Sequence, residues 1–358
     1  MKSLSPADSS NQAASSQTDN PVDGSPPDMK ASDMKASAMQ PTDMQPSNTY
    51  AERMEPDPEE ADRWAYDEVH PAGVTVFHHQ QLGYHLTLQI VPLEQVVPHE
   101  HYHGRRVAEL VARLVAEGKL INPPIAMLYK GTYVILDGAT RLTALRHLGY
   151  SYMIVQVVEP EQQRVELSTW HHVINGGSAG ELLEVLRNVS GLKLSPSGGE
   201  KLNGRELPAG ALGYLFTADK ESFVLEVAPE SAEEDGDWLD VLNRLVEAYG
   251  EWGDVERTVV TDVEQLSAQF PNLAALVSFP RFTIEMILEL AAQGRTVPAG
   301  ITRFIIPGRI LRLNVPLDKL AADEPIAEKR AWLDALVQEK LRARQVRFYE
   351  EPVVLLDE

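Results

Sequence analysis

The chain has 358 residues, of which 43% are hydrophobic, and its 53 acidic and 32 basic residues give a net charge of −21. This length suffices for one large domain or two modest ones. An acidic surface repels phosphate backbones, so nucleic-acid partners are disfavoured, although a local basic groove is compatible with this charge. Cysteine is absent, which excludes disulfides, thiolate metal sites and cysteine nucleophiles.

The first 60 residues lack the pattern of a folded domain. Ser, Pro, Asp and Gln dominate, no aromatic residue precedes Tyr50, and a five-residue unit recurs from Asp28. We therefore expect a disordered acidic low-complexity tail at 1–60 and a linker at 61–84. The sequence has neither an apolar run of about 18 residues nor an apolar signal core, so we expect a cytoplasmic protein without a membrane partner.

Regular patterning starts near residue 85 and predicts a first α/β unit over 85–160. Apolar alternation predicts strands, and apolar residues at helical spacing predict helices that close at glycines. The expected strands are 85–91, 124–129, 132–136 and 152–158, with the middle two forming a hairpin, and the expected helices are 105–117 and 139–148.

A second α/β unit is predicted over 161–320, followed by a C-terminal helical extension at 321–358. In the second unit the expected helices are 181–189, 238–249, 262–269 and 283–292, and the expected strands are 213–217, 222–227, 258–261, 274–279 and 303–307. The extension contains one long amphipathic helix at 326–346, which either packs on the body or mediates association.

The most informative local motif is VILDGATRLTALRHLG at 134–149. An apolar strand ends at Asp137-Gly138 and turns directly into a helix that bears Arg141. Gly138 permits close approach of a ligand to the backbone, and the free N–H groups of the helix start, together with Arg141, attract phosphate. The spacing is equally compatible with an alternative in which Asp137 only ends the strand and Arg141 forms a surface ion pair.

A second motif, PHEHYH at 98–103, contains three alternate histidines. In an extended segment His99, His101 and His103 share one face, so they are weak candidates for binding a metal or haem. Glu100 lies on the other face and could serve as a general base. The alternative for Glu100 is an ordinary surface carboxylate.

Two further motifs are STWHH at 168–172 and GITRFIIP at 300–307. Trp170 is either a core residue or the cover of a cleft. Thr302 and Arg303 lead an apolar strand, and Arg303 could hold a carboxylate through two parallel hydrogen bonds.

Together, in the order PHE, DGxxR, TW and TR, these motifs resemble the ParB/sulfiredoxin-like superfamily and, within it, the free L-serine kinases. The resemblance implies an α/β (α+β) fold, with a ParB/sulfiredoxin-like nucleotide-binding domain at 85–160. It also implies that the second α/β domain, at 161–320, contributes the substrate pocket.

The resemblance implies phosphoryl transfer from ADP or ATP, with Mg2+, to the hydroxyl of free L-serine or a similar small amino acid. Its partners would be a nucleotide and an amino acid, and the oligomeric state stays open. By position, the family roles fall on catalytic Glu100 and Asp137, nucleotide-binding Gly138, Thr140 and Arg141, and substrate-binding Trp170, Thr302 and Arg303.

The chain departs from the family pattern at two places. Two motif histidines of the archaeal kinases are replaced by Ala139 and Thr140, and a histidine after the TR pair is replaced by Phe304. Two other functions therefore stay open. One is a ParB-like nucleotide-binding regulator, and the other is a ligand-sensing relative without kinase activity that responds to haem or metal.

Deletion of residues 1–60 should leave the fold and any activity intact, because a segment of this composition buries little apolar surface. Thermal unfolding of the shortened and full chains, followed by circular dichroism, tests this expectation. A melting temperature lower by more than a few degrees would show that the segment packs on the body.

Overall fold

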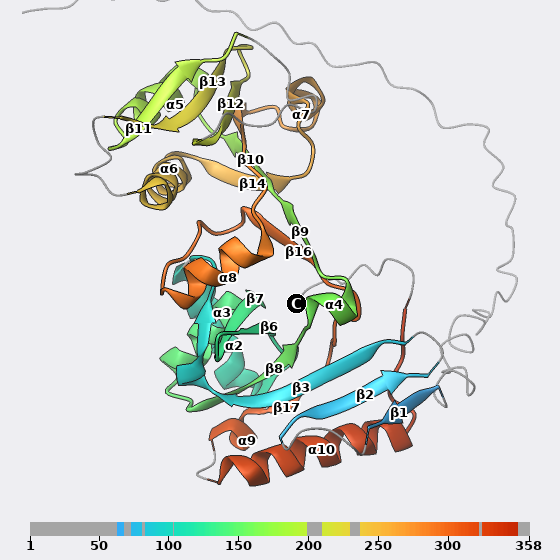
Figure 1. The fold of residues 1–358 in the computed structure, drawn as a ribbon. Coiled ribbons are helices and arrows are strands. Elements are labelled where there is room, and N and C mark those ends of the chain that lie inside the picture. Colours follow the sequence, from blue (N-terminus) through green and yellow to red (C-terminus); the bar gives the residue numbers. More distant parts are fainter. Residues whose placement is uncertain are drawn as a thin grey trace, which may run out of the picture. The chain divides into compact units, whose positions relative to one another are not determined.

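The structure is a computed structural model that describes residues 63–67, 73–80, 83–102, 104–198, 210–229, 237–321 and 324–349. These residues form a mixed α/β fold (Figure 1), which confirms the predicted fold class. The chain divides into two compact units, Met1–Glu55 and Pro56–Glu358, and all described residues belong to the second. The tail expected at 1–60 lies outside the described residues.

The first sheet has seven strands in the order β1-β2-β3-β8-β6-β7-β4. Its strands are β1 (Trp64–Tyr66), β2 (Thr75–His79), β3 (His85–Pro92), β4 (Val96–Pro98), β6 (Ile125–Tyr129), β7 (Thr132–Asp137) and β8 (Tyr152–Val157). The predicted β6–β7 hairpin is confirmed, and β4 and β6 add parallel pairs with β7 and β8 respectively. The parallel β4–β7 pair brings the start of the PHE segment beside the strand that ends at Asp137.

Helices α2 (Gly104–Glu117), α3 (Ala139–His147), α9 (Leu317–Ala321) and α10 (Ile326–Arg342) bury apolar side chains in the core of this sheet. Helix α10 contacts β1, β2 and β3 (Figure 1), with Leu333 and Val337 buried against them. The long C-terminal helix therefore packs on the body, which was one of the two outcomes expected from its pattern.

The second sheet has six strands in the order β11-β13-β12-β15-β10-β14. Its strands are β10 (His171–Asn175), β11 (Leu192–Pro196), β12 (Ala211–Thr217), β13 (Ser222–Val227), β14 (Asp254–Thr258) and β15 (Leu273–Ser278). All their pairings are antiparallel. Strand β15 is buried along its whole length, as expected for a central strand.

Helices α5 (Ala179–Arg187), α6 (Trp238–Trp252), α7 (Val263–Gln269) and α8 (Ile284–Ala292) belong to this half of the chain. Each begins at a polar residue whose side chain accepts backbone N–H bonds, and these residues are Ser178, Asp237, Asp262 and Thr283. Such capping satisfies donors that the first helical turn leaves free. It explains why these helices were predictable from local sequence.

Two short antiparallel pairs join segments that lie far apart in the sequence. Strand β9 (Glu166–Thr169) pairs with β16 (Thr302–Ile305), and β5 (Lys119–Leu120) pairs with β17 (Val315–Pro316). A 3-10 helix η3 (Leu93–Gln95) and helix α4 (Pro160–Gln163) complete the described elements. The β9–β16 pair places Thr302 opposite Thr169, next to Trp170.

Two expectations about local structure were wrong. The segment 61–84 is not a plain linker, because it contributes β1 and β2, whose Trp64 and Phe77 are buried in the core. The strand expected at 258–261 lies earlier, at Asp254–Thr258, where pairing with β10 sets its register. In both cases tertiary pairing outweighed a weak local pattern. Within the described ranges, no helix has the length and apolar character needed to cross a membrane.

Replacing Asp237 with Ala should lower the free energy of unfolding by about 0.5–2 kcal/mol, the usual cost of losing a helix N-cap. Asp237 accepts the N–H of Leu239 at 3.0 Å and of Asp240 at 3.4 Å, and the guanidinium of Arg295 contacts both of its oxygens. Chemical denaturation near neutral pH measures the difference.

The pH dependence of this effect follows from the same contacts. The hydrogen bonds from Arg295 lower the pKa of Asp237 from 3.8 to about 2. The stabilisation is therefore complete above about pH 4 and is lost as the pH falls toward 2. Asp237→Asn keeps an oxygen that can accept the capping N–H bonds but loses the negative charge. The difference in the free energy of unfolding between this variant and the wild type should therefore shrink as the pH falls from about 4 toward 2. A constant difference would contradict the assignment.

Candidate active site

The turn between β7 and α3 has the geometry that its sequence predicts. Asp137 is the last residue of β7, and Gly138 follows with φ of 103°, the left-handed conformation that favours glycine. A Cβ at position 138 would lie 2.9 Å from the guanidinium carbon of Arg141. The backbone conformation therefore favours glycine at position 138, and a Cβ there would also force the guanidinium of Arg141 to shift.

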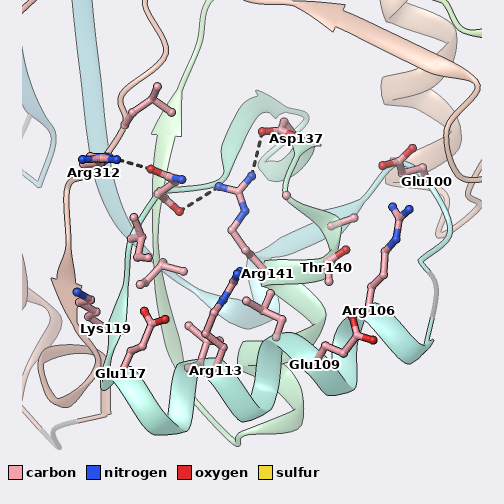
Figure 2. A pocket seen from close by; sticks show the side chains of 18 of the residues that line it. Glu100, Arg106, Glu109, Arg113, Glu117, Lys119, Asp137, Thr140, Arg141 and Arg312 are labelled. Atoms are coloured by element: carbon pink, nitrogen blue, oxygen red, sulfur yellow. Dashed lines mark hydrogen bonds and ion pairs between the residues drawn. The ribbon is translucent and has the colours of Figure 1, made fainter. Parts of the chain in front are cut away.

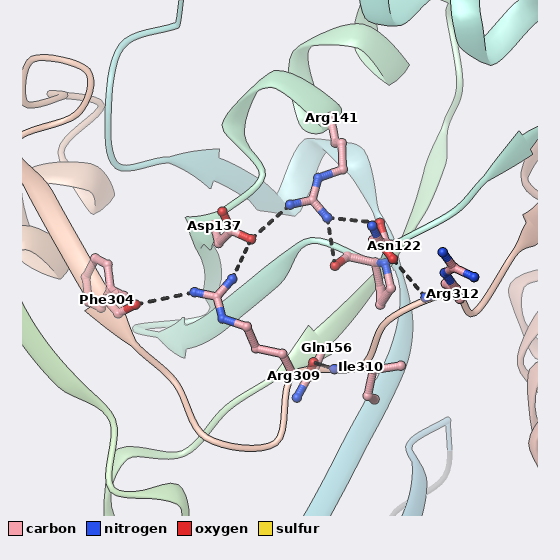
Figure 3. Close-up of polar contacts among 9 residues, drawn as sticks. Asn122, Asp137, Arg141, Gln156, Phe304, Arg309, Ile310 and Arg312 are labelled. Atoms are coloured by element: carbon pink, nitrogen blue, oxygen red, sulfur yellow. Dashed lines mark hydrogen bonds and ion pairs between the residues drawn. The ribbon is translucent and has the colours of Figure 1, made fainter. Parts of the chain in front are cut away.

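Arg141 is held by three acceptors from the protein. Its Nη2 donates to Asp137 Oδ2 at 2.9 Å, and its Nη1 donates to the carbonyl oxygens of Asn122 and Pro123, each at 3.0 Å (Figure 3). The backbone N–H of Arg312 donates to the Asn122 side chain at 2.8 Å. Arg141 thus fixes the turn to the β5–β6 loop, in addition to facing the pocket.

Arg309 is a site residue that sequence reasoning missed. Its Nη1 donates to Asp137 Oδ2 at 2.9 Å, and its Nη2 donates to the carbonyl of Phe304 at 3.3 Å (Figure 3). The buried Gln156 holds the loop on both sides of Arg309, because it donates to Gly308 O at 2.8 Å and accepts from Ile310 N at 2.9 Å. The available signal was the basic segment GRILR at 308–312, directly after the strand predicted at 303–307.

The two arginines set the ionisation of Asp137. Burial by itself raises the pKa of this carboxyl, but the charges and hydrogen bonds of Arg141 and Arg309 outweigh it, so the net shift is downward. Asp137 is therefore a stable carboxylate at neutral pH. Its contacts to both arginines use Oδ2, and the side chain stays 42% exposed toward the pocket.

Glu100 follows β4 and is held by a segment from the second half of the chain. Val297 N donates to His99 O at 3.0 Å and His101 N donates to Val297 O at 2.9 Å, which fixes the backbone on both sides of Glu100. The N–H of Gly300 donates to Glu100 Oε2 at 3.0 Å. The carboxylate is therefore oriented through one oxygen.

His172 positions Gly300 from the opposite side. This buried histidine has Nε2 at 3.0 Å from Gly300 O and Nδ1 at 2.6 Å from the hydroxyl of Tyr249. Burial raises the pKa of Tyr249 well above 10.0, so its phenol stays neutral. The STWHH motif thus contributes a positioning histidine that was not singled out from the sequence.

His99 does not face the pocket. Its Nδ1 lies 2.6 Å from Ile135 O and its Nε2 lies 2.8 Å from the hydroxyl oxygen of Thr302, and the ring meets Phe304 edge-on. A neutral ring with the proton on Nδ1 satisfies both contacts, since Nε2 then accepts from Thr302. Both nitrogens are thus engaged within the protein. His101 is exposed, and His103 lies outside the described residues.

A pocket of about 870 Å3 opens between these elements (Figure 2). It contains predicted residues Glu100, Asp137, Gly138, Thr140 and Arg141. Of its charged lining residues, six are basic (Arg106, Arg113, Lys119, Arg141, Arg257 and Arg312) and four are acidic (Glu100, Glu109, Glu117 and Asp137). The pocket is therefore net positive in a chain whose net charge is −21, as an anionic ligand requires.

The predicted amino-acid residues adjoin this pocket rather than line it. The guanidinium of Arg303 lies 4.8 Å from the ring centre of Trp170, and that of the pocket residue Arg257 lies 5.9 Å from the same ring. Arg257 also packs against Gly300, the partner of Glu100. Trp170 is thus linked to Glu100 through Arg257 and Gly300. The Thr302 hydroxyl, in contrast, is buried against His99.

Comparisons with known proteins point to one group of enzymes. No family model matches the chain. It is 26% identical over 276 residues to the ATP-dependent L-serine kinase SbnI of Staphylococcus aureus, which covers 76% of this chain and 98% of that protein. It is 24% identical over 243 residues to an ATP-dependent L-serine kinase of Staphylothermus marinus, covering 66% of this chain and 92% of the relative.

Solved structures share the fold. C-terminally truncated SbnI from Staphylococcus aureus has a TM-score of 0.55 and 24% identity, covering 71% of this chain and 96% of that structure. A free serine kinase in complex with AMP has a TM-score of 0.54 and 19% identity, covering 65% and 93%. The described α/β fold is thus the fold found in structures of free serine kinases.

Proposed function

We propose that this chain transfers a phosphoryl group from ATP or ADP to the hydroxyl of free L-serine, or of a similar small amino acid, giving O-phosphoserine. The observation that carries the proposal is the placement of Glu100. It is an oriented carboxylate at one end of a net-positive pocket, and that pocket also contains the Asp137-Gly138 turn. The names of the relatives, ATP-dependent L-serine kinases, supply the substrate class.

Glu100 acts as the general base. Gly300 occupies one carboxylate oxygen, Oε2, and fixes the direction of the other, Oε1, which accepts the serine hydroxyl proton. The hydroxyl oxygen attacks the terminal phosphorus, the bond from that phosphorus to the bridging oxygen breaks, and the shortened nucleotide leaves with the electron pair. Phosphoryl transfer of this kind depends on positioning and charge neutralisation more than on covalent chemistry.

The nucleotide phosphates bind at the turn before α3. The free N–H groups at the start of this helix and the basic side chains around the pocket supply donors and positive charge. Within the described part of the chain, the side chains of Arg106, Lys119 and Arg312 form no ion pair with a carboxylate, so their charges are available to phosphate. Gly138, Thr140 and Arg141 complete this nucleotide-binding set.

Mg2+ fits the donors of this pocket. It prefers carboxylate and phosphate oxygens, and Asp137 is an ionised carboxylate whose Oδ1 is not used by either arginine. Asp137 would hold the ion together with the nucleotide phosphates. When bound, Mg2+ neutralises charge that develops on the transferred group. Arg141 and Arg309 keep Asp137 ionised and in place.

The amino acid binds beside Trp170 and Arg303. The planar guanidinium of Arg303 holds the α-carboxylate, and the indole of Trp170 covers the substrate while its π face stabilises the arginine. The hydroxyl of Thr302 on β16 hydrogen-bonds to His99, and His99 hydrogen-bonds to Ile135 on β7. Thr302 thus helps to hold the substrate segment against the first sheet. Phe304, at the position where the family has a histidine, packs edge-on against the ring of His99.

Glu100→Gln should lower kcat by about 10²–10⁴-fold, the range for loss of a general base, and leave nucleotide affinity nearly unchanged. The amide oxygen can still accept the Gly300 N–H, so the loop geometry is kept while the proton acceptor is lost. Steady-state kinetics and nucleotide calorimetry measure the two effects. Glu117→Gln, a second pocket carboxylate, is the matched control and should change kcat far less. Retained turnover in Glu100→Gln would remove its assigned role.

Arg303→Lys should raise the KM for the amino acid far more than the KM for the nucleotide. Lysine keeps the charge but loses the planar pair of donors that grips a carboxylate. Arg106→Lys, in the nucleotide pocket, should raise the KM for the nucleotide more than the KM for the amino acid. Kinetics with each substrate varied in turn provide the comparison, and equal changes in both KM values for Arg303→Lys would contradict its placement at the amino acid.

A further inference from the structure

Three potential metal ligands come together on the first sheet, outside the pocket described above. They are Asp67, which follows β1, His78 on β2 and His85 at the start of β3. Their ligand atoms all lie within 4.8 Å of one another. None of these residues was predicted as a ligand from the sequence, because they lie on or directly after three separate strands.

Strand register explains why they share one face. His78 pairs directly with His85 on β3 and with Ala65 on β1. Asp67 lies two residues beyond Ala65, so it projects from the same side of the sheet. The neighbouring residues Phe77 and Leu86 alternate to the other side and are buried in the core with α10. The three side chains therefore lie on the face away from α10.

The geometry within the cluster is that of converging ligands. His78 Nδ1 lies 2.6 Å from Asp67 Oδ1, and His85 Nδ1 lies 3.8 Å from Asp67 Oδ2. Despite the short distance, His78 Nδ1 is buried without a directed hydrogen bond from the described residues. The two imidazole rings are stacked, with their centroids 5.3 Å apart and an angle of 27° between their planes. The ligand atoms of all three side chains thus converge within 4.8 Å of one another, which is close enough for them to contact one ion.

We propose that Asp67, His78 and His85 form a binding site for a first-row divalent transition metal, with Zn2+ as the representative ion. Two imidazole nitrogens and one carboxylate oxygen suit Zn2+, whereas Mg2+ and Ca2+ prefer oxygen ligands alone. The side chains are 27%, 26% and 50% exposed for His78, Asp67 and His85, so water reaches the site and can fill a remaining coordination position.

The bound ion would link three adjacent strands at one edge of the first sheet. Because its ligands lie directly after β1, on β2 and on β3, all three can contact the ion only when these strands are paired. Binding to the native state alone stabilises that state in proportion to the logarithm of metal concentration. The site shares no residue with the pocket that contains Glu100 and Asp137. It is therefore independent of the kinase proposal.

The test is zinc binding by the full chain after metal has been removed with a chelator. Calorimetry with ZnCl2 should give one saturable ion in the wild type that is lost in His85→Ala. Asp67→Asn keeps the shape but removes the anionic ligand. Loss of a residue that only hydrogen-bonds to a metal ligand costs about 10–100-fold in metal affinity. Loss of Asp67, which would bind the metal directly, should cost at least as much.

The matched control is His147→Ala, which removes an exposed histidine on α3 and should bind zinc as the wild type does. Circular dichroism and the melting temperature in chelator should be alike for all four proteins, which separates loss of a ligand from loss of fold. With ZnCl2 the melting temperature should rise most in the wild type and in His147→Ala, and less in Asp67→Asn and His85→Ala. Zinc bound at other places appears equally in every variant.

Loss of one ion in His85→Ala and weakened binding in Asp67→Asn, with His147→Ala unchanged, supports the site. Equal zinc binding by the wild type and His85→Ala overturns it. No zinc binding by the wild type also overturns it and leaves Asp67 and His78 in contact with each other without a metal. A loss in His147→Ala as large as that in His85→Ala assigns the binding to unspecific histidines and equally overturns the proposal.

Discussion

The pairing of residues 297–302 with the segment around Glu100 is the interaction on which the proposed active site depends. Val297 bonds to the backbone on both sides of Glu100, Gly300 donates to its carboxylate, and Thr302 bonds to His99. His172 holds Gly300 from the second sheet. Without this junction, Glu100 would be a carboxylate on a surface loop, because among the described residues its side chain accepts a hydrogen bond from Gly300 and not from its own segment.

The second constraint is electrostatic. A chain with a net charge of −21 can bind nucleotide phosphates only where positive charge is concentrated, and the pocket carries more basic than acidic side chains. Asp137 lies among them as a carboxylate whose pKa is lowered by Arg141 and Arg309, despite the opposing effect of burial. This mutual support keeps Asp137, the ligand proposed for Mg2+, ionised at the pocket. Both arginines donate to the same oxygen of Asp137, Oδ2.

Local sequence predicted the parts of the site that are local in structure. The Asp137-Gly138 turn and the helix after it follow from an apolar strand, a glycine with positive φ and a helix start, all within a few residues. The capped helices α5, α6, α7 and α8 were predictable for the same reason. The second sheet was predicted only in part, because β10 and β11 carry weak alternation and owe their place to neighbouring strands.

The contacts that complete the site span long stretches of sequence. Arg309 reaches Asp137 across 172 positions, Gly300 reaches Glu100 across 200, and His172 reaches Gly300 across 128. No periodicity or spacing encodes such pairs, since they exist only after the sheets have assembled. The same reason explains why 61–84 was taken for a linker. Its strands are short, and they gain their burial from β3 and α10.

The central claim is that the pocket transfers a phosphoryl group to a free amino acid. Phosphorus NMR of the purified full chain with Mg2+, L-serine and either ATP or ADP tests it most directly, with L-alanine as the matched acceptor without a hydroxyl. The account predicts a new phosphomonoester resonance that grows with L-serine, is absent with L-alanine and coincides with added O-phosphoserine. Nucleotide binding without that resonance for any hydroxyl-bearing amino acid would contradict the account and favour a nucleotide-binding regulator.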